Sequence, residues 1–161
     1  MELSWVILQA VINGVLVGGV YSLIAIGLTI IFGTMGAINF AHGEYLTLAM
    51  YITYWLFVLM GLHPYVSLII LFPIMFIVGI LVYRGLVQPM LKAPLQNQFI
   101  LTLGLSLGIM GLLQVLWTAE FRNVIIAAPL LTFYDLRISG VRLIAFITAL
   151  IFNGLLFLFL R

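Results

Sequence analysis

The segment INFAHGEY, residues 38–45, breaks a stretch of sequence that is otherwise almost entirely apolar. Between Glu2 and Glu44 no side chain carries a formal charge, and His42 and Glu44 then follow two positions apart. An acidic residue costs about 2.5–3.5 kcal/mol at the centre of a membrane-spanning helix, whereas a carboxylate near a helix N-terminus gains about 0.3–1 kcal/mol from the helix dipole. These magnitudes predict that Glu44 lies in the first turn of a helix and caps free amides there. His42 is then expected in the preceding non-helical turn, beside Asn39.

The composition identifies the solvent in which the chain folds. Hydrophobic residues make up 66% of the 161 residues, charged residues make up 6%, and the mean hydropathy is +1.37. Soluble domains carry about a quarter charged residues, so this is an integral membrane protein. There is no cysteine, which excludes disulfides and thiolate chemistry. The six basic and four acidic residues are too few and too scattered for a nucleic-acid surface.

The apolar segments predict the number of crossings. A helix rises about 1.5 Å per residue and the hydrocarbon layer is about 30 Å thick, so a crossing needs about 20 apolar residues. Five segments qualify, at residues 5–32, 45–60, 65–83, 99–117 and 143–160. The sequence therefore predicts an all-α, polytopic bundle of about five membrane-spanning helices, forming one domain over residues 1–161.

The ends of the first three segments carry specific signals. The first would be about 42 Å long as a straight helix, so it must tilt, protrude or break near Gly27 or Gly33. The second is short unless it begins near Gly43. The turn GLHP, residues 61–64, supplies a glycine and then a proline, which predicts a helical hairpin between the second and third segments.

Two longer connections follow, at residues 84–98 and 118–142. The second contains FYDLRIS, residues 133–139, whose alternating pattern predicts a short strand or hairpin at the membrane face. Basic residues do not settle the orientation of the bundle, because three fall on each side of the membrane. Those on one side are Arg84, Lys92 and Arg161, and those on the other are Arg122, Arg137 and Arg142.

Small residues form stripes on two of the predicted helices. Gly14, Gly18 and Ser22 are spaced at i, i+4 and i+8, and Gly104 and Gly108 repeat the spacing. Such stripes let helix backbones approach closely in lipid, so we predict a packing role for them, with substrate contact as the alternative.

Uncharged polar residues also occur at membrane depth. Most are expected to form hydrogen bonds between helices, which are worth about 0.6 kcal/mol each on average. Asn13 and Thr102 are the candidates for lining a path. The full set is Asn13, Tyr21, Ser22, Thr102, Ser106, Gln114, Thr148 and Asn153.

Three interpretations remain open for the turn around Asn39, His42 and Glu44. It is a structural cap, or a gate of a translocation path, since irregular backbone at membrane depth is tolerated only beside protein or a water-filled cavity. The third is metal binding or acid–base catalysis. The spacing of His42 and Glu44 suits two ligands on one helical face poorly, and the other histidine, His63, is expected in a surface turn. We therefore predict no metal site, no catalytic residue and no cofactor.

The segment NGVLVGGVYSLIAIGLTIIFGTMGAINFAHGEYLTLAMY, residues 13–51, resembles the N-terminal signature of the branched-chain amino acid permeases of bacterial ATP-binding cassette importers. The resemblance continues through residues 88–117 and 136–161. This permease group also includes importers of urea and short amides.

The resemblance implies a transport subunit rather than an enzyme, carrying leucine, isoleucine and valine across the bacterial inner membrane. It would work with a second permease subunit, two cytoplasmic ATPases that hydrolyse the ATP, and a periplasmic binding protein. The implied orientation has the N-terminus outside, the turn at 38–45 and the 84–98 connection facing the cytoplasm, and the 118–142 connection outside. Asn39, His42, Glu44 and Gln98 would then flank the cytoplasmic mouth of the path.

Members of that family are nearly twice as long, so we expect this chain to be the N-terminal portion of a permease. The family's coupling segment is absent, and so is a Walker-type nucleotide motif. This polypeptide alone is therefore expected to be unable to couple ATP to transport. Arg122, Arg137 and Arg142 would pair with the binding protein or remain solvated loop charges. A passive channel and an intramembrane enzyme using His42 and Glu44 remain the rival functions.

Overall fold

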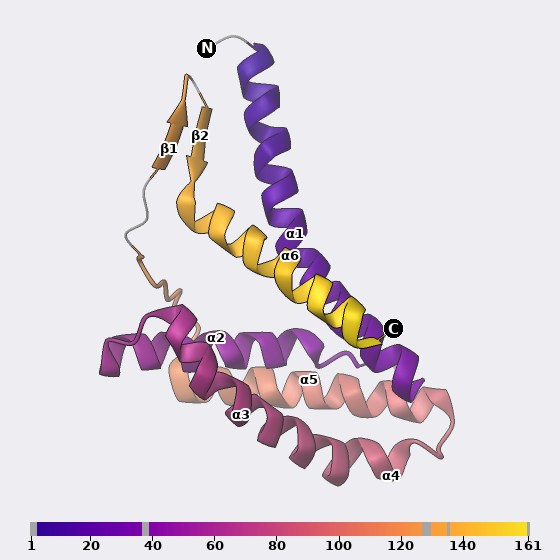
Figure 1. Cartoon of the computed structure of the whole chain (residues 1–161). Coiled ribbons are helices and arrows are strands. Elements are labelled where there is room, and N and C mark those ends of the chain that lie inside the picture. Colours follow the sequence, from indigo (N-terminus) through magenta and orange to yellow (C-terminus); the bar gives the residue numbers. More distant parts are fainter. Residues whose placement is uncertain (1–2, 37–38, 127–129, 135, 161) are drawn as a thin grey trace. The chain divides into compact units, whose positions relative to one another are not determined.

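The computed structural model describes residues 3–36, 39–126, 130–134 and 136–160, and they are mostly helical (Figure 1). Five helical segments in the described part of the chain are long and apolar enough to cross a membrane. They run over Leu3–Thr34, His42–Met60, Pro64–Met90, Leu95–Trp117 and Gly140–Leu160. The predicted all-α, polytopic architecture is therefore confirmed, and the chain is a multi-pass membrane protein.

Helix α1, Leu3–Met35, is 33 residues long and is not interrupted. It passes through Gly27 and Gly33, so the break that the sequence allowed at these positions does not occur. Its length of about 50 Å exceeds the hydrocarbon layer, which leaves tilting or protrusion. The helix ends at Gly36, whose positive φ of 64° suits glycine, and the amide of Gly36 donates to the carbonyl of Phe32 at 2.8 Å.

Helices α2, His42–Met60, and α3, Pro64–Val82, form the predicted hairpin. Gly61 adopts the left-handed conformation (φ 64°) and donates its amide to Phe57, while Leu62 donates to Leu56, a pattern that satisfies the last carbonyls of α2. His63 then caps α3 by accepting a hydrogen bond on Nδ1 from the amide of Tyr65 at 3.4 Å. His63 is exposed, as expected for a residue of a surface turn.

The helix that begins as α3 continues well into the connection predicted at residues 84–98. A π-helical segment η1, Tyr83–Val87, and a short helix α4, Gln88–Met90, follow α3 directly. Pro89 has no amide hydrogen and its ring would clash with the carbonyl four residues earlier, at Gly85. The wider π turn, in which Gln88 donates to the carbonyl of Tyr83, accommodates this defect. The prediction of a loop over the first part of this connection was therefore wrong.

Helix α5, Leu95–Trp117, starts in the polar sequence LQNQ and includes Gln98 in its first turn. Strands β1, Leu130–Phe133, and β2, Leu136–Ser139, pair antiparallel with Leu130 opposite Ser139, so the predicted hairpin is confirmed. Helix α6, Gly140–Leu160, begins immediately after β2.

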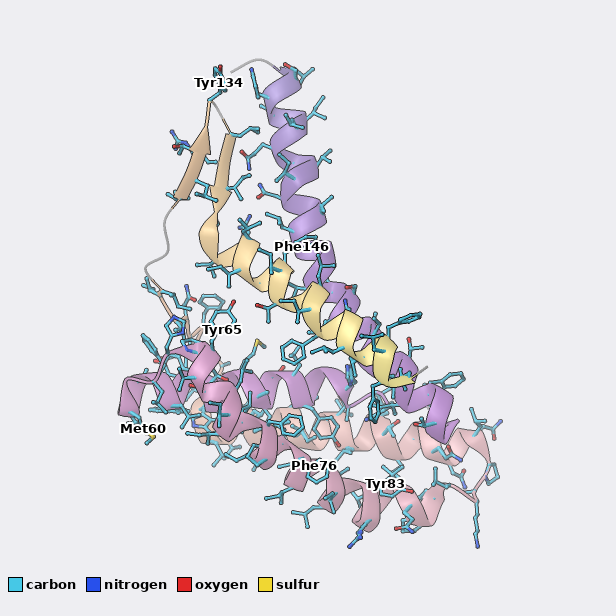
Figure 2. All side chains as sticks on the ribbon, in the orientation of Figure 1. Met60, Tyr65, Phe76, Tyr83, Tyr134 and Phe146 are labelled. Atoms are coloured by element: carbon cyan, nitrogen blue, oxygen red, sulfur yellow. The ribbon has the colours of Figure 1, made fainter. Side chains whose placement is uncertain are left out.

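The chain divides into two compact units. The first comprises residues 1–30 and 125–161, and the second comprises residues 31–124. In the first unit, Figure 2 shows Phe146 extending from α6 toward α1, where its ring fills the space beside Gly19. A side chain at residue 19 would collide with that ring, so the glycine permits this contact between α1 and α6.

Candidate functional site

Helices α2 and α5 of the second unit lie side by side and run in the same direction (Figure 1). The rings of Phe40 and Phe99 are 4.4 Å apart at one end. The rings of Tyr51 and Trp117 stack at 4.9 Å at the other end. The residue number rises along both helices from one contact to the next, which is the pattern of parallel helices.

Between these two aromatic contacts, the hydroxyl of Ser106 donates a hydrogen bond to Oε1 of Glu44 at 3.3 Å. Ser106 is the midpoint of the 23-residue α5, whereas Glu44 is in the first turn of α2. Helix α2 therefore begins partway along α5. If α5 crosses the bilayer, the carboxylate of Glu44 lies near the middle of the hydrocarbon layer, where acidic residues are rare and mark transport paths or proton relays.

The position of Glu44 in the first turn of α2 confirms the sequence prediction, but its capping role was wrong. In the described part of the chain, the N-cap residue Ala41 makes no side-chain cap, and the Glu44 carboxylate bonds to Ser106 rather than to an amide of this helix start. Oxygens of the turn itself accept from four of the amides at this helix start, those of Ala41, His42, Glu44 and Tyr45. Asn39 accepts from Ala41 on its side chain and from His42 on its backbone, and the carbonyl of Ala41 accepts from Glu44 and Tyr45. The carboxylate is therefore left to interact with α5. His42 is the first residue of α2, not part of the preceding turn as predicted.

A hollow of about 260 Å³ lies beside Glu44, between α2 and α5. Glu44, Thr47 and Tyr51 line it from α2, and they lie at i, i+3 and i+7, on one helical face. Gln114 and Thr118 contribute polar groups from the other side, and the hydroxyl of Tyr51 donates to the carbonyl of Thr118 at 3.5 Å. Thr47 and Tyr51 were not predicted as site residues from the sequence, although their spacing from Glu44 was a usable signal.

A second cavity, of about 270 Å³, lies on the side of α2 that carries Tyr45. Its lining includes both Asn39 and Thr102, which were predicted from the sequence to belong to a path. Thr102 is 3% exposed and donates its hydroxyl to the carbonyl of Phe99 at 3.2 Å. Residues of α3 and η1 complete the wall.

Two other residues predicted for the path line neither of these cavities and form hydrogen bonds elsewhere. The amide of Gln98 donates to the carbonyls of Ala93, at 3.0 Å, and Leu91, at 3.4 Å, in the loop before α5. Asn13 lies in the first unit, where its side-chain oxygen accepts from Arg142 at 3.1 Å. A role for either residue in a path stays a prediction.

The glycine stripes show no close neighbours in the described part of the chain. No heavy atom lies within 4 Å of the position that a Cβ would take at Gly14, Gly18, Gly104 or Gly108. Their packing role therefore stays a prediction, while Gly19 makes the close approach to α6. Ser22 does connect the helices, because its hydroxyl accepts from the side chain of Asn153 at 2.8 Å.

Two further polar contacts were not expected from the sequence. The side-chain amide of Gln9 donates to the carbonyl of Arg137 at 2.9 Å and accepts from its amide at 2.8 Å, so it anchors β2 to α1. Arg122 lies over the rings of Tyr54 and Trp55, with 5.5 Å and 5.2 Å to their centroids, and donates to the carbonyl of Trp117. Arg122 is therefore held against α2 and is not a freely solvated loop charge.

Within the ranges that the structure describes, no group of three His, Asp or Glu residues is close enough to hold a metal ion. The two hollows are instead lined by a carboxylate, hydroxyls and amides among apolar side chains.

The family model of the branched-chain amino acid transport system permease component matches residues 10–161. The chain belongs to this permease family. Individual relatives match over shorter segments. The high-affinity branched-chain amino acid transport system permease protein BraD of Pseudomonas aeruginosa is 51% identical over 47 residues, which is 29% of this chain and 15% of the relative. The permease protein LivH of Escherichia coli (strain K12) is 49% identical over a segment of the same length and coverage.

A probable branched-chain amino acid transport permease protein LivH of Methanocaldococcus jannaschii is 37% identical over 93 residues, covering 56% of this chain and 29% of the relative. The matched segments thus span less than a third of the length of these curated relatives. A comparison with solved structures finds no significant match.

Proposed function

We propose that this permease-family chain acts within a subunit of an ATP-binding cassette importer that carries leucine, isoleucine and valine across the bacterial inner membrane. Its partners are a second permease subunit, two cytoplasmic ATPases and a periplasmic binding protein, and its N-terminus lies outside. The family match over residues 10–161 and the names of the relatives support the substrate class.

The single observation that carries a transport role is the position of Glu44. Its carboxylate meets the midpoint of a membrane-spanning helix and lines a hollow together with the hydroxyls of Thr47 and Tyr51. A carboxylate in the hydrocarbon layer is costly unless a partner or water-filled space accommodates it. No cationic side chain pairs with Glu44 among the described residues. Glu44 therefore suits the ammonium group of a passing amino acid.

The start of α2 is the proposed gate. Helices that begin inside the membrane supply binding sites in many transporters, because their first amides and irregular backbone face a cavity. Here Asn39, His42, Glu44 and Thr102 surround such a start, and the Phe40–Phe99 contact links the turn to the first part of α5, near Gln98. A shift of the turn between two states of the importer would move both hollows.

The transport class is tested in the intact importer that contains this chain, reconstituted in vesicles with its binding protein. We expect uptake of labelled leucine to require both ATP and the binding protein. Uptake that persists when either is withdrawn would identify a passive channel instead. Uptake of urea or acetamide without uptake of leucine would reassign the substrate within the same permease group.

The role of Glu44 is tested by Glu44→Gln, which keeps the size of the side chain and removes its charge. A hydrogen bond to a charged group is worth about 1.5–3 kcal/mol, so we expect leucine uptake to fall by about 10- to 150-fold at equal amounts of assembled protein. Glu120→Gln is the matched control, because Glu120 is exposed and lies after α5. Equal uptake by the two variants would remove Glu44 from the path.

A further inference from the structure

Several elements of one compact unit line the second cavity. Asn39 comes from the turn before α2, Tyr45 from α2 and Thr102 from α5. The last turns of α1, helix α3 and the π-helical segment η1 provide the remaining wall, in which Gly79 and Tyr83 lie one turn apart. Figure 2 shows Tyr83 at the end of α3, where this wall passes into η1.

The cavity combines an apolar wall with one polar group that lacks a partner. Met75, Val82 and Val87 are among its lining side chains. The hydroxyl oxygen of Tyr45 is buried and has no hydrogen-bond partner among the residues that the structure describes. Buried hydroxyls are almost always hydrogen-bonded, and each one left without a partner costs about 1–3 kcal/mol. An occupant that offers a hydrogen bond would remove this cost.

The π-helical segment explains why the space exists at this position. A π turn is wider than an α turn and rotates the following residues relative to those before it, and such turns are frequent at functional sites. Tyr83 and Val87, the first and last residues of η1, both line the cavity. The wider π turn that accommodates Pro89 therefore shapes one wall of the cavity.

We propose that this cavity receives the aliphatic side chain of the transported amino acid, with the Tyr45 hydroxyl bonding to its polar backbone. The assignment rests on the proposed function. The volume of about 270 Å³ exceeds that of an engineered apolar cavity of about 150 Å³ that binds benzene, so a branched aliphatic group fits. A lipid acyl chain would fill the apolar part but offers no partner for the hydroxyl of Tyr45.

Gly79 gives the means to change the size of this cavity. It lines the cavity, and no heavy atom in the described chain lies within 4 Å of the position that its Cβ would take. A Cβ at residue 79 therefore meets nothing outside the nearby backbone of its own helix, and a longer side chain would extend from a position that lines the cavity. Because Gly79 is inside α3, alanine there also has the higher helix propensity.

The experiment compares Gly79→Ala, Gly79→Val and Gly79→Leu in the intact importer, with labelled leucine and labelled alanine each supplied at saturating concentration. We expect the ratio of leucine to alanine uptake to fall stepwise, by about tenfold or more for Gly79→Leu, because the added atoms occupy the space of the larger substrate. Gly154→Leu in α6 is the control, since residue 154 also has open space around its Cβ but lies in the other unit.

Tyr45→Phe supplies the second measurement, because it keeps the ring and removes only the hydroxyl. We expect uptake of both amino acids to fall by a similar factor of about 2 to 10, as for the loss of one hydrogen bond. An unchanged leucine-to-alanine ratio across the Gly79 series, or full uptake by Tyr45→Phe, would overturn the assignment and leave a lipid-filled groove. An unmodified importer that carries neither leucine nor valine would instead refute the proposed function, so the two failures are distinguishable.

Discussion

The two units of the chain use polar side chains in opposite ways. In the first unit, polar groups of α1 pair with partners on β2 and α6. These pairs are Gln9 with Arg137, Asn13 with Arg142, and Ser22 with Asn153. In the second unit, Glu44, Tyr45 and Thr47 at the start of α2 face two hollows.

The difference separates polar side chains that hold helices together from polar side chains that line a hollow. Lipid offers no hydrogen bonds, so a polar side chain at membrane depth must meet protein, water or a ligand. Polar side chains that bond to each other within the chain satisfy this requirement permanently and hold helices together. At the hollows the chain uses only part of this hydrogen-bonding capacity: Glu44 accepts a hydrogen bond from Ser106, whereas the buried hydroxyl of Tyr45 has no partner among the described residues. Composition does not separate these two cases, because both use amides and hydroxyls.

The largest expected effect on stability is at Gly19 of the first unit. Gly19→Leu would force its side chain into the ring of Phe146. Overpacking of this kind costs about 1–3 kcal/mol or more, so we expect a lower Tm and a less stable contact between α1 and α6. Gly18→Leu is the matched control, since residue 18 has open space. A Tm for Gly19→Leu equal to that of Gly18→Leu, measured in detergent, would show that this contact does not hold the unit together.

A smaller effect is expected at Arg122, the cation that the second unit holds against two aromatic rings. Arg122→Gln removes the contact with Tyr54 and Trp55, and such contacts are worth about 0.5–2 kcal/mol. We expect a lower unfolding free energy in a denaturant titration and a change in Trp55 fluorescence. Arg137→Gln should leave both unchanged, because the side chain of Arg137 is exposed and only its backbone bonds to Gln9.

The smallest expected effect tests whether the pairs of the first unit are purely structural. Ser22→Ala and Asn153→Ala, alone and combined, form a double-mutant cycle across α1 and α6. We expect a coupling of about 0.6 kcal/mol and transport within about twofold of the unmodified importer. A large loss of uptake without loss of stability would move this pair into the path and blur the distinction between the units.

Local sequence patterns predicted many helix ends and turns correctly. Gly61 and Pro64 marked the helical hairpin, because left-handed backbone and proline geometry are local properties. The alternation of residues 133–139 marked β2 but reached only the last residue of β1, Leu130–Phe133, which begins before that segment. The connection after Tyr83 was mispredicted because a π turn can absorb a proline that ordinarily ends a helix.

The structure brings together only some of the residues predicted for the path, since they were chosen one at a time. Asn39 and Thr102 do share a cavity, but Gln98 and Asn13 bond elsewhere. Neither Gly79 nor Tyr45 was predicted as a site residue. Gly79 lies in an apolar stretch, and Tyr45 ends the polar segment at residues 38–45, where Asn39, His42 and Glu44 drew the predictions. The relevance of both follows from the wall to which α2, α3 and η1 contribute.

The sequence by itself determined that the chain folds in a membrane, where its five membrane-spanning segments lie and where the short hairpins occur, because hydropathy, helix length and turn chemistry act over a few residues at a time. The order of residues in its motifs also indicated the family. The tertiary structure alone decided the stagger of α2 against α5 and the choice between Gly18 and Gly19. It also decided which polar groups are paired and which face a hollow. These are relations between residues far apart in the chain, and packing sets them by how two helix surfaces fit.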